Sequence, residues 1–189
     1  STFSDSDGRY RASGMLYQWG RKDPMNAITV QYIASSPYYN IEDSFSAPTT
    51  FVQTWTWLEN GGVRGLWSED QKTMYDPCPP GWKVADRNSW DSIHSLESDG
   101  YGVLLRYSSE SETVQYPFAP WYNSDWSYYD GYSEGHIWTT SLQDDWYPYN
   151  FRYESGWYST VESRNNSDAL SVRCMKDVGF IVSTLDAEV

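Results

Sequence analysis

Few residues of this chain have the type and spacing that covalent or acid–base chemistry needs. The 189 residues include two histidines, His94 and His136, and two cysteines, Cys78 and Cys174. No H-E-x-x-H pattern, G-x-S-x-G nucleophile motif or phosphate-binding loop occurs. No pair of carboxylates is singled out for glycoside hydrolysis. We interpret His94, on a predicted helix, and His136, in a predicted turn, as structural. We therefore expect no enzymatic activity, no catalytic residue and no cofactor, and a glycan-processing enzyme is the weakest alternative.

Residue types suited to ligand recognition gather between Trp121 and Asp168. Trp, Tyr, Asn, Ser and Asp crowd into W-Y-N-S-D-W-S-Y-Y-D-G-Y (121–132), D-D-W-Y-P-Y-N-F-R-Y (144–153) and G-W-Y (156–158). A segment that served burial alone would be rich in Leu, Val and Ile. Tyr and Trp instead combine a broad, rigid face with a polar group, the combination enriched at recognition surfaces. The aromatic stretch therefore predicts a ligand-binding region.

This stretch divides into expected scaffold and expected binding residues. Trp138, in I-W-T-T-S (137–141), is expected to pack inside, as are Tyr149 and Phe151, which would share one face of a predicted strand with Tyr147 and Tyr153. Side chains flanked by Asn, Asp, Ser and Gly are expected to lie on loops and to be displayed. The predicted ligand-binding residues are Tyr122, Asn123, Asp125, Trp126, Tyr128, Tyr129, Tyr132, Asp144, Asp145, Trp146, Tyr158, Asn165 and Asn166.

Four aspartates of the stretch could supply oxygen ligands to a calcium ion, namely Asp125, Asp130, Asp144 and Asp145. Their spacing is not that of a known calcium loop. We favour the interpretation that they are solvated carboxylates that accept hydrogen bonds from ligand hydroxyls, and we predict no metal site.

Charge and hydropathy exclude some partners. The net charge of -13 is spread along the chain and argues against nucleic acid, because phosphate binding depends on clustered Lys and Arg. No apolar run approaches the roughly 20 residues that span a bilayer, so no direct membrane insertion is expected. No signal peptide is visible, and we expect the chain to be a processed or excised piece of an exported protein.

The two cysteines allow two interpretations, buried free thiols or a disulfide. Cys78 lies in the rigid turn D-P-C-P-P-G and Cys174 in the strand-like S-V-R-C-M, which suits a link between distant segments. We favour the disulfide, and with it an oxidising compartment. Neither cysteine belongs to a C-x-x-C pair, so a zinc site is not expected.

Local patterns predict one helix among short strands. Asp86 can cap a helix in which Trp90, Ile93 and Leu96 or Glu97 share a face and which ends near Gly100. Strands are expected at 16–19, 101–107 and 169–176, and the tryptophans of 55–67 are expected to serve packing. The pattern favours an α+β or mostly β domain at 15–177, after a lead-in at 1–14 and before an extension at 178–189 with one further strand.

Several blocks resemble a known family. These are L-Y-Q-W-G-R-K-D-P (16–24), A-P-T-T-F-V (47–52), L-W (66–67), K-T-M-Y-D-P-C-P-P-G-W-K-V (72–84), the segment around Trp90, I-W-T-T-S (137–141) and S-V-R-C-M-K-D (171–177). Their order is similar to that of the Fibrobacter succinogenes major paralogous domain family, which is abundant in Bacteroidetes surface proteins. The resemblance implies an α+β, C-type-lectin-like fold with one main helix, a small antiparallel sheet and long aromatic-rich loops. It also implies that Cys78, opening that helix, is bonded to Cys174.

The resemblance implies a function as well. Such domains serve as binding modules of adhesins and fimbriae at the cell surface, and 121–168 corresponds to their ligand-binding loops. Its composition also resembles that of variable proteins of diversity-generating retroelements. The E-P-N, Q-P-D and W-N-D motifs of calcium-dependent sugar binding are absent. We predict an extracellular, adhesin-like domain that binds a glycan or protein, attached to pilus subunits or to the N-terminal part of a larger adhesin. A structural pilus or surface-layer subunit is the alternative.

Overall fold

The computed structural model describes residues 14–26, 33–34, 36–107, 113–125, 127–129, 131 and 133–178. The predicted lead-in, apart from Gly14, and the predicted C-terminal extension with its further strand, apart from Val178, lie outside the described residues. The division of the chain into lead-in, domain and extension stays a prediction.

The protein is mostly β, with 43% of the structure in strands and 7% in helices. In chain order the strands are β1 (Met15–Gln18), β2 (Met25–Asn26), β3 (Ile33–Ala34), β4 (Phe51–Val52), β5 (Trp82–Val84), β6 (Ile93–Ser98), β7 (Gly102–Tyr107), β8 (Thr113–Pro117), β9 (Trp121–Tyr122), β10 (Tyr128–Tyr129), β11 (Glu134–Leu142), β12 (Pro148–Glu154), β13 (Trp157–Ser163), β14 (Ala169–Val172) and β15 (Cys174–Lys176). The helices are α2 (Ile41–Ser44) and the 3-10 helices η1 (Glu59–Gly61) and η2 (Arg87–Trp90). The prediction of an α+β, C-type-lectin-like fold built on one main helix is therefore wrong.

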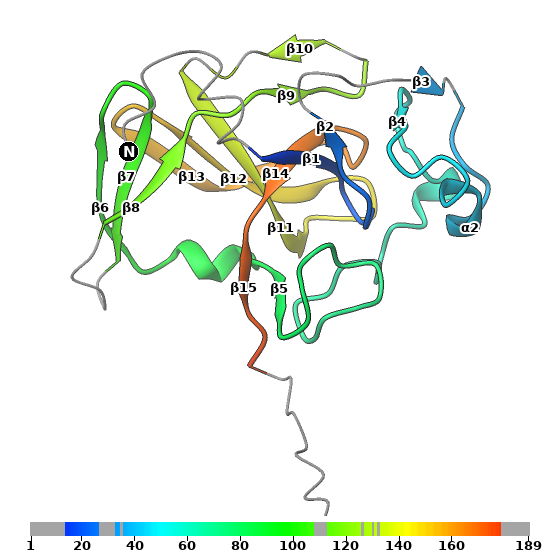
Figure 1. Ribbon diagram of the computed structural model, residues 1–189, viewed down its shortest axis with the longest axis horizontal. Helices are drawn as coiled ribbons and strands as arrows, with labels where there is room; N and C mark the ends of the chain where they lie inside the picture. The colour runs from blue at the N-terminus through cyan, green and yellow to red at the C-terminus, as the bar shows by residue number, and fades with distance from the viewer. Residues whose placement is uncertain are drawn as a thin grey trace, which may run out of the picture.

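One large sheet curls into a half-barrel and contains most of the later strands (Figure 1). Its order is β10-β9-β14-β11-β12-β13, and β1 joins by pairing with β14. Strand β11 runs antiparallel to β12 and parallel to β14. All its residues from Gly135 to Ser141 are buried, as expected for a strand covered on both faces. This buried strand is a rigid support for the loops at its two ends.

Three smaller sheets complete the described fold. Strands β6, β7 and β8 form an antiparallel sheet, β5 pairs with β15, and β3 runs parallel to β4. The strands predicted at 16–19, 101–107 and 169–176 correspond to β1, β7 and the pair β14 and β15. These predictions are confirmed to within one or two residues, apart from the break between β14 and β15.

The helix predicted after Asp86 is a single 3-10 turn followed by a β-hairpin. Asp86 does cap this turn, because its Oδ1 accepts a hydrogen bond from the backbone N–H of Ser89 at 2.8 Å. The chain then extends, and β6 pairs antiparallel with β7. Asp99, Gly100 and Tyr101 connect the two strands, with Gly100 at a φ of 84°, a conformation that glycine adopts readily. Sheet pairing therefore outweighs the short helical periodicity.

Tryptophans build one part of the core. Trp19, Trp57 and Trp138 are fully buried. Each indole N–H donates to a backbone carbonyl at 2.7 Å: Trp19 to Thr139, Trp57 to Trp19, and Trp138 to Tyr17. Because these polar groups are paired, burying the rings leaves no donor unsatisfied. The chain can therefore form a core from amphipathic rings with few aliphatic side chains.

A second part of the core lies under η2, between the large sheet and the β6-β7-β8 sheet. The ring of Trp90 stacks on Phe151 of β12 with centroids 4.3 Å apart. Tyr153 is buried, and its hydroxyl donates to the carbonyl of Pro117 at 2.7 Å. The inward packing predicted for Phe151 is confirmed by its complete burial.

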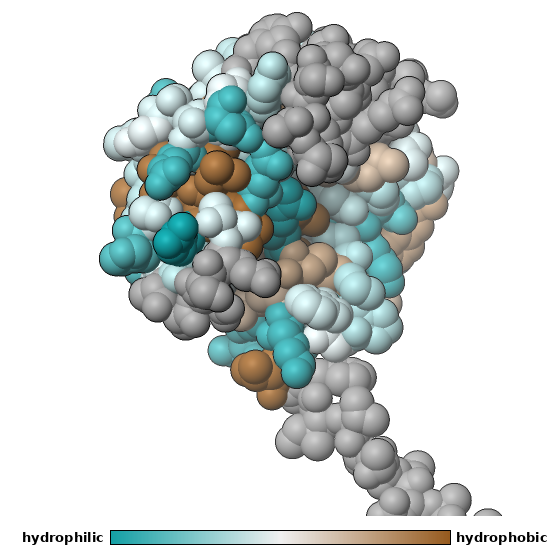
Figure 2. Space-filling view, turned by 60° about the vertical axis from the view of Figure 1, so that its left-hand side comes forward, coloured by the Kyte–Doolittle hydropathy of each residue, from teal (hydrophilic) through white to brown (hydrophobic). Residues whose placement is uncertain are grey.

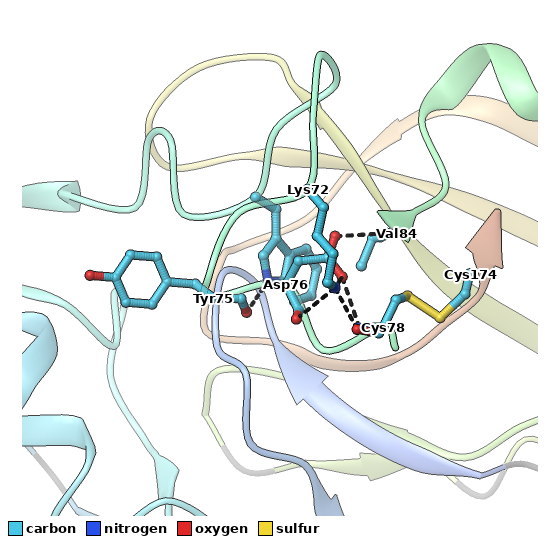
Figure 3. The surroundings of a disulfide bond; sticks show 7 residues. Lys72, Tyr75, Asp76, Cys78, Val84 and Cys174 are labelled. Carbon is cyan, nitrogen blue, oxygen red and sulfur yellow. Dashed lines mark hydrogen bonds and ion pairs between the residues drawn. A yellow bond between two sulfur atoms is a disulfide. The ribbon is translucent and has the colours of Figure 1, made fainter. Parts of the chain in front are cut away.

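A disulfide joins Cys78 to Cys174, with their Cα atoms 5.8 Å apart (Figure 3). This pairing confirms the predicted disulfide. Cys78 does not open a main helix, however, and lies in the loop before β5. Because β15 pairs with β5 and places Cys174 opposite Val84, the disulfide fastens the last described strand to that loop.

A buried carboxylate organises the same loop (Figure 3). Asp76 is 1% exposed. Its Oδ1 accepts hydrogen bonds from the backbone N–H of Cys78 at 2.8 Å and from the ammonium of Lys72 at 2.9 Å. Its Oδ2 accepts from the N–H of Val84 at 2.9 Å. One side chain therefore holds the start, the middle and the end of the segment that carries Cys78.

The outer surface is largely polar on the side shown in Figure 2, which brings the left-hand side of Figure 1 forward. Among the coloured residues of this face, hydrophilic and intermediate ones dominate, and hydrophobic ones gather in separate patches. Within the described residues, no helix is long and apolar enough to cross a membrane.

Candidate ligand-binding surface

The hairpin of β9 and β10 carries the first group of exposed rings. Trp121 and Tyr122 of β9 are buried, whereas Tyr128 and Tyr129 of β10 are 42% and 41% exposed. Tyr129 stacks on Trp121 with centroids 3.9 Å apart, and Tyr128 contacts Tyr122 with centroids 4.9 Å apart. Each exposed ring therefore rests on a buried ring of the neighbouring strand.

Polar side chains shape the turn between these two strands. The backbone N–H of Ser127 lies 2.7 Å from Oδ1 of Asn123 and 2.9 Å from Oδ1 of Asp125. The N–H of Asn123 donates to the carbonyl of Ser127 at 3.1 Å. Asn and Asp favour turns because their short side chains bind nearby backbone groups in this way. These two predicted binding residues therefore also hold the hairpin in shape.

Arg164 and Asp168 contact the β9–β10 hairpin from a neighbouring loop. The guanidinium carbon of Arg164 lies 3.8 Å from the centre of the Trp121 ring. Tyr129 also stacks on this indole. Because one face of the indole cannot hold both the tyrosine ring and the guanidinium, Trp121 lies between Tyr129 and Arg164. Asp168 accepts from Arg164 at 3.1 Å and from the backbone N–H of Ser124 at 2.7 Å. The two members of this partly buried ion pair thus connect the 164–168 loop to the hairpin, Asp168 through Ser124 and Arg164 through Trp121.

The second group of exposed rings lies on the 143–147 loop and on the segment after β4. Trp55 is 62% exposed and Trp146 is 36% exposed. The ring of Trp55 meets Tyr147 edge-on with centroids 6.3 Å apart. Oδ1 of Asp144 accepts hydrogen bonds from the backbone N–H groups of Trp146 and Tyr147 at 2.8 and 3.0 Å. The loop is therefore held by its own aspartate.

A hydrogen bond joins the two groups, and an ion pair holds the 143–147 loop. The amide Nε2 of Gln53 donates to the carbonyl of Asp125 in the hairpin turn at 3.0 Å. The guanidinium Nε of Arg64 lies 2.5 Å from Oδ1 of Asp145, which precedes Trp146. We refer to Trp55, Tyr128, Tyr129 and Trp146 as the aromatic surface. Its rings come from three segments that contact one another.

Several predicted binding residues are not displayed with this surface. Tyr122 is 8% exposed and supports Tyr128. Asn165 and Asn166 are buried, contrary to the exposed positions expected for them. The backbone N–H of Asn166 donates to the carbonyl of Trp146 at 3.0 Å, and its carbonyl accepts from the N–H of Trp19. These residues connect the displayed loop to the core.

The remaining predicted binding residues are separated from the aromatic surface or outside the described residues. Tyr158 is 37% exposed but lies on β13, at the opposite end of the strand order from β10. Its ring packs 5.8 Å from that of Phe151. Trp126, Asp130 and Tyr132 lie outside the described residues. A ligand-binding role for each of these residues stays a prediction.

The sequence interpretation did not identify Trp55. The tryptophans of 55–67 were expected to pack inside, which Trp57 and Trp67 do at 0% and 2% exposure. Trp55 and Trp57 lie two positions apart, so alternation places them on the same face of an extended chain. Nothing in the local pattern distinguishes the exposed tryptophan from the buried one.

The buried His136 lies beside the partly exposed Glu134 on β11. His136 lies inside β11, and not in the turn expected for it, and is 1% exposed. Its Nδ1 lies 2.9 Å from Oδ1 of Asn150, and its Nε2 lies 3.5 Å from Oε2 of Glu134. Burial lowers the pKa of His136. The proximity of His136, with the charge of Arg152, lowers the pKa of Glu134 to about 2.

The other histidine lies apart from this pair. His94 is exposed on β6, and not on a helix as expected. Among the described residues, no group of three or more His, Cys, Asp or Glu side chains is placed to hold a metal ion.

The contribution of Asp168 to the stability of the fold depends on pH. Burial raises the pKa of Asp168 to about 6, although Arg164 opposes the shift. A carboxyl with a raised folded-state pKa stabilises the fold at low pH and loses that contribution as pH rises through the folded pKa. We expect Asp168→Asn to gain about 2 kcal/mol relative to the unsubstituted protein between pH 4.5 and 7.5, measured by urea unfolding.

Asp125→Asn is the matched control for this measurement. Asp125 is exposed, and its hydrogen bond with Ser127 lowers its pKa, so it stays ionised across the same range. The difference between this variant and the unsubstituted protein should change far less from pH 4.5 to 7.5, because the charge of Asp125 is only the smallest of the influences on the pKa of Asp168. Equal pH dependence of Asp168→Asn and the unsubstituted protein would contradict the assigned role of Asp168.

No protein-family model, curated protein or solved structure matches the chain.

Proposed function

We propose that this protein recognises a glycan or protein ligand through the aromatic surface. The observation that carries this proposal is the exposure of four large rings, between 36% and 62%, on segments fastened to a buried sheet. Exposed aromatic clusters with polar neighbours are typical of interaction sites. Since the supporting hydrogen bonds are intramolecular, the rings are held in place before a ligand arrives, which reduces the entropy lost on binding.

Aromatic rings and polar groups would have different roles in recognition. The faces of Trp55 and Trp146 would pack against the apolar side of a sugar ring or a side chain of a protein ligand. Asn123, Asp125 and Asp144 lie in the same loops and would form hydrogen bonds that select among ligands of similar shape. No covalent step is needed for this function.

The cell surface is the proposed location. Disulfides persist in oxidising compartments, and the bond between Cys78 and Cys174 supports export of the protein. Diversification of the binding face by a retroelement stays part of the proposal. Sequencing the gene in sibling strains tests it, with substitutions expected to concentrate in residues 122–132 and 144–147.

A glycan and protein array tests the ligand-binding function. The intact chain is expected to bind at least one member of the array. Tyr128→Ala/Tyr129→Ala and Trp55→Ala/Trp146→Ala should each weaken that binding at least about tenfold, because aromatic side chains at the centre of an interface contribute most of the affinity.

Trp82→Ala is the control variant for the array. Trp82 is an exposed tryptophan (46%) on β5, far from β10 in Figure 1. Its replacement removes similar aromatic area and should leave binding unchanged. Circular dichroism checks that each variant is folded. If both double variants are folded and still bind the ligand, the ligand site lies outside the aromatic surface.

A further inference from the structure

Two tryptophans of the aromatic surface carry no cation over their rings. Elsewhere in the described part of the chain, guanidinium carbons lie 3.8 to 5.9 Å from the centres of aromatic rings, and they belong to Arg21, Arg87, Arg152, Arg164 and Arg173. Among the described residues, Trp55 and Trp146 have no such neighbour, although Trp55 is the most exposed tryptophan of that part of the chain. Their rings are therefore open to a cation supplied by a partner.

The carboxylates of the same segments also lack a cation. Two arginines lie near the aromatic surface, and each is already paired with an aspartate: Arg64 with Asp145, and Arg164 with Asp168. Asp125 and Asp144 have no ion-pair partner among the described residues. Backbone N–H groups hold both carboxylates in place but do not neutralise their charge. Two negative charges are therefore left without a counter-charge in the described structure.

Each of these carboxylates lies close to one of the open rings in the chain or through a contact. Both backbone N–H groups that bind Asp144, one of them that of Trp146, donate to its Oδ1. No donor of the described residues bonds to its Oδ2, and this atom is not buried. Asp125 is exposed, and its carbonyl accepts from Gln53, two positions before Trp55. An open ring and an unpaired carboxylate thus occur together in both parts of the surface.

A planar cation would complement both features. The guanidinium of an arginine stacks on aromatic rings and donates to carboxylates, whereas a lysine ammonium has no flat face. A neutral sugar would leave both carboxylates without a counter-charge, and an anion would be repelled by them and by the net charge of -13. We propose that the partner of the aromatic surface is a protein segment that displays arginine side chains. This inference rests on the proposed function and narrows its ligand to a basic protein segment.

Titration of the ¹⁵N-labelled chain with short peptides tests this class of ligand. The probe is Gly-Ser-Arg-Gly-Ser-Arg-Gly-Ser, acetylated and amidated so that its ends are uncharged. It is expected to shift the indole N–H resonances of Trp55 and Trp146 saturably, with a dissociation constant of about 1 mM. No saturation at these two resonances would overturn the proposal.

Three comparison peptides separate charge from shape. Citrulline in place of both arginines keeps the planar group without its charge, and this peptide should bind at least about fivefold more weakly. The lysine peptide should bind more weakly than the arginine peptide, and the glutamate peptide should not bind. Equal affinity for the arginine and citrulline peptides would show that the charge is not recognised, and equal or tighter binding of the lysine peptide would contradict the choice of arginine.

Asp125→Asn/Asp144→Asn removes both charges and keeps amide oxygens that accept the backbone hydrogen bonds. This double variant should bind the arginine peptide at least about fivefold more weakly, since each exposed ion pair contributes modestly. Asp91→Asn/Glu97→Gln is the matched control. Asp91 follows η2 and Glu97 lies on β6, which belongs to a different sheet from β10, and both are exposed. The control should change the affinity by less than about twofold. Equal losses in the two double variants would contradict recognition by Asp125 and Asp144.

The outcomes distinguish the class of ligand from the site. If Trp55→Ala/Trp146→Ala loses its array ligand while the arginine peptide does not bind, the partner does not carry the expected arginines and the proposed function stands. A neutral glycan as the array ligand of this surface would likewise overturn only the arginine assignment. Saturable shifts of Trp82 or Trp157 alone would place the cation site elsewhere and overturn it as well.

Discussion

A Cys78→Ser/Cys174→Ser variant is expected to lose about 4 to 5 kcal/mol of unfolding free energy, because the disulfide closes a loop of about 100 residues in the unfolded chain. The two residues are 96 positions apart. Since domains are commonly stable by only about 5 to 15 kcal/mol, much of the fold's stability should depend on this bond. Urea unfolding of the oxidised protein and of the double variant measures the loss.

The reduced, unsubstituted protein is the control for this variant. It should unfold at the same urea concentration as the double serine variant, because both lack the covalent link. A midpoint for the double variant equal to that of the oxidised protein would contradict the stabilising role of the disulfide.

Asp76→Ala is expected to cost about 3 to 5 kcal/mol, because it leaves two buried backbone donors without their acceptor and removes the ion pair of the partly buried Lys72 ammonium. Asp76→Asn should cost less, since its amide oxygen still accepts a hydrogen bond. The N–H groups concerned belong to Cys78 and Val84, on either side of the proline turn. Urea unfolding in oxidising buffer measures both losses.

Asp70→Ala is the matched control, because Asp70 is an exposed carboxylate six positions earlier in the chain. It should change the unfolding free energy by less than about 0.5 kcal/mol. If Asp76→Ala and Asp70→Ala lower the unfolding free energy by the same amount, Asp76 does not hold the loop as described. Since Asp76 and the disulfide hold the same segment, combining their removal should cost less than the sum of the separate losses.

Parts of this fold were predictable because their cause is local. Strand β1 and the segment of β14 and β15 contain apolar residues in short extended runs, and the disulfide needed only two cysteines in suitable contexts. Asp86 was correctly identified as a cap, since its side chain bonds to a backbone group three residues later. Such features depend on a few neighbouring residues.

The helix prediction for the region of the β6–β7 hairpin is wrong, because the hairpin depends on pairing between strands and not on the spacing of nearby residues. Trp90, Ile93 and Leu96 satisfy a helical spacing, but the spacing covers only two turns. The pairing of β7 with both β6 and β8 buries Val103 and Leu105, which no helix at 86–100 would do. The Asp99-Gly100 pair, which is typical of hairpin turns, was the evidence against the helix.

The predicted division of the aromatic stretch into buried and exposed residues is confirmed for Trp138 and Phe151 but wrong for Tyr122, Asn165 and Asn166. Asn166 resembles a loop residue in sequence, yet it is buried because it connects the 143–147 loop to Trp19. Trp55 resembles its buried neighbour Trp57. Both outcomes depend on which segments meet in space. Membership of the Fibrobacter succinogenes major paralogous domain family stays a prediction.

The most direct test of the aromatic surface is an NMR spectrum of the indole N–H groups, recorded with and without the ligand selected from the array. The resonances of Trp55 and Trp146 are expected to shift or broaden on binding, while those of the buried Trp57 and the distant Trp82 stay unchanged. Shifts of Trp82 or Trp157, with Trp55 and Trp146 unchanged, would contradict this expectation.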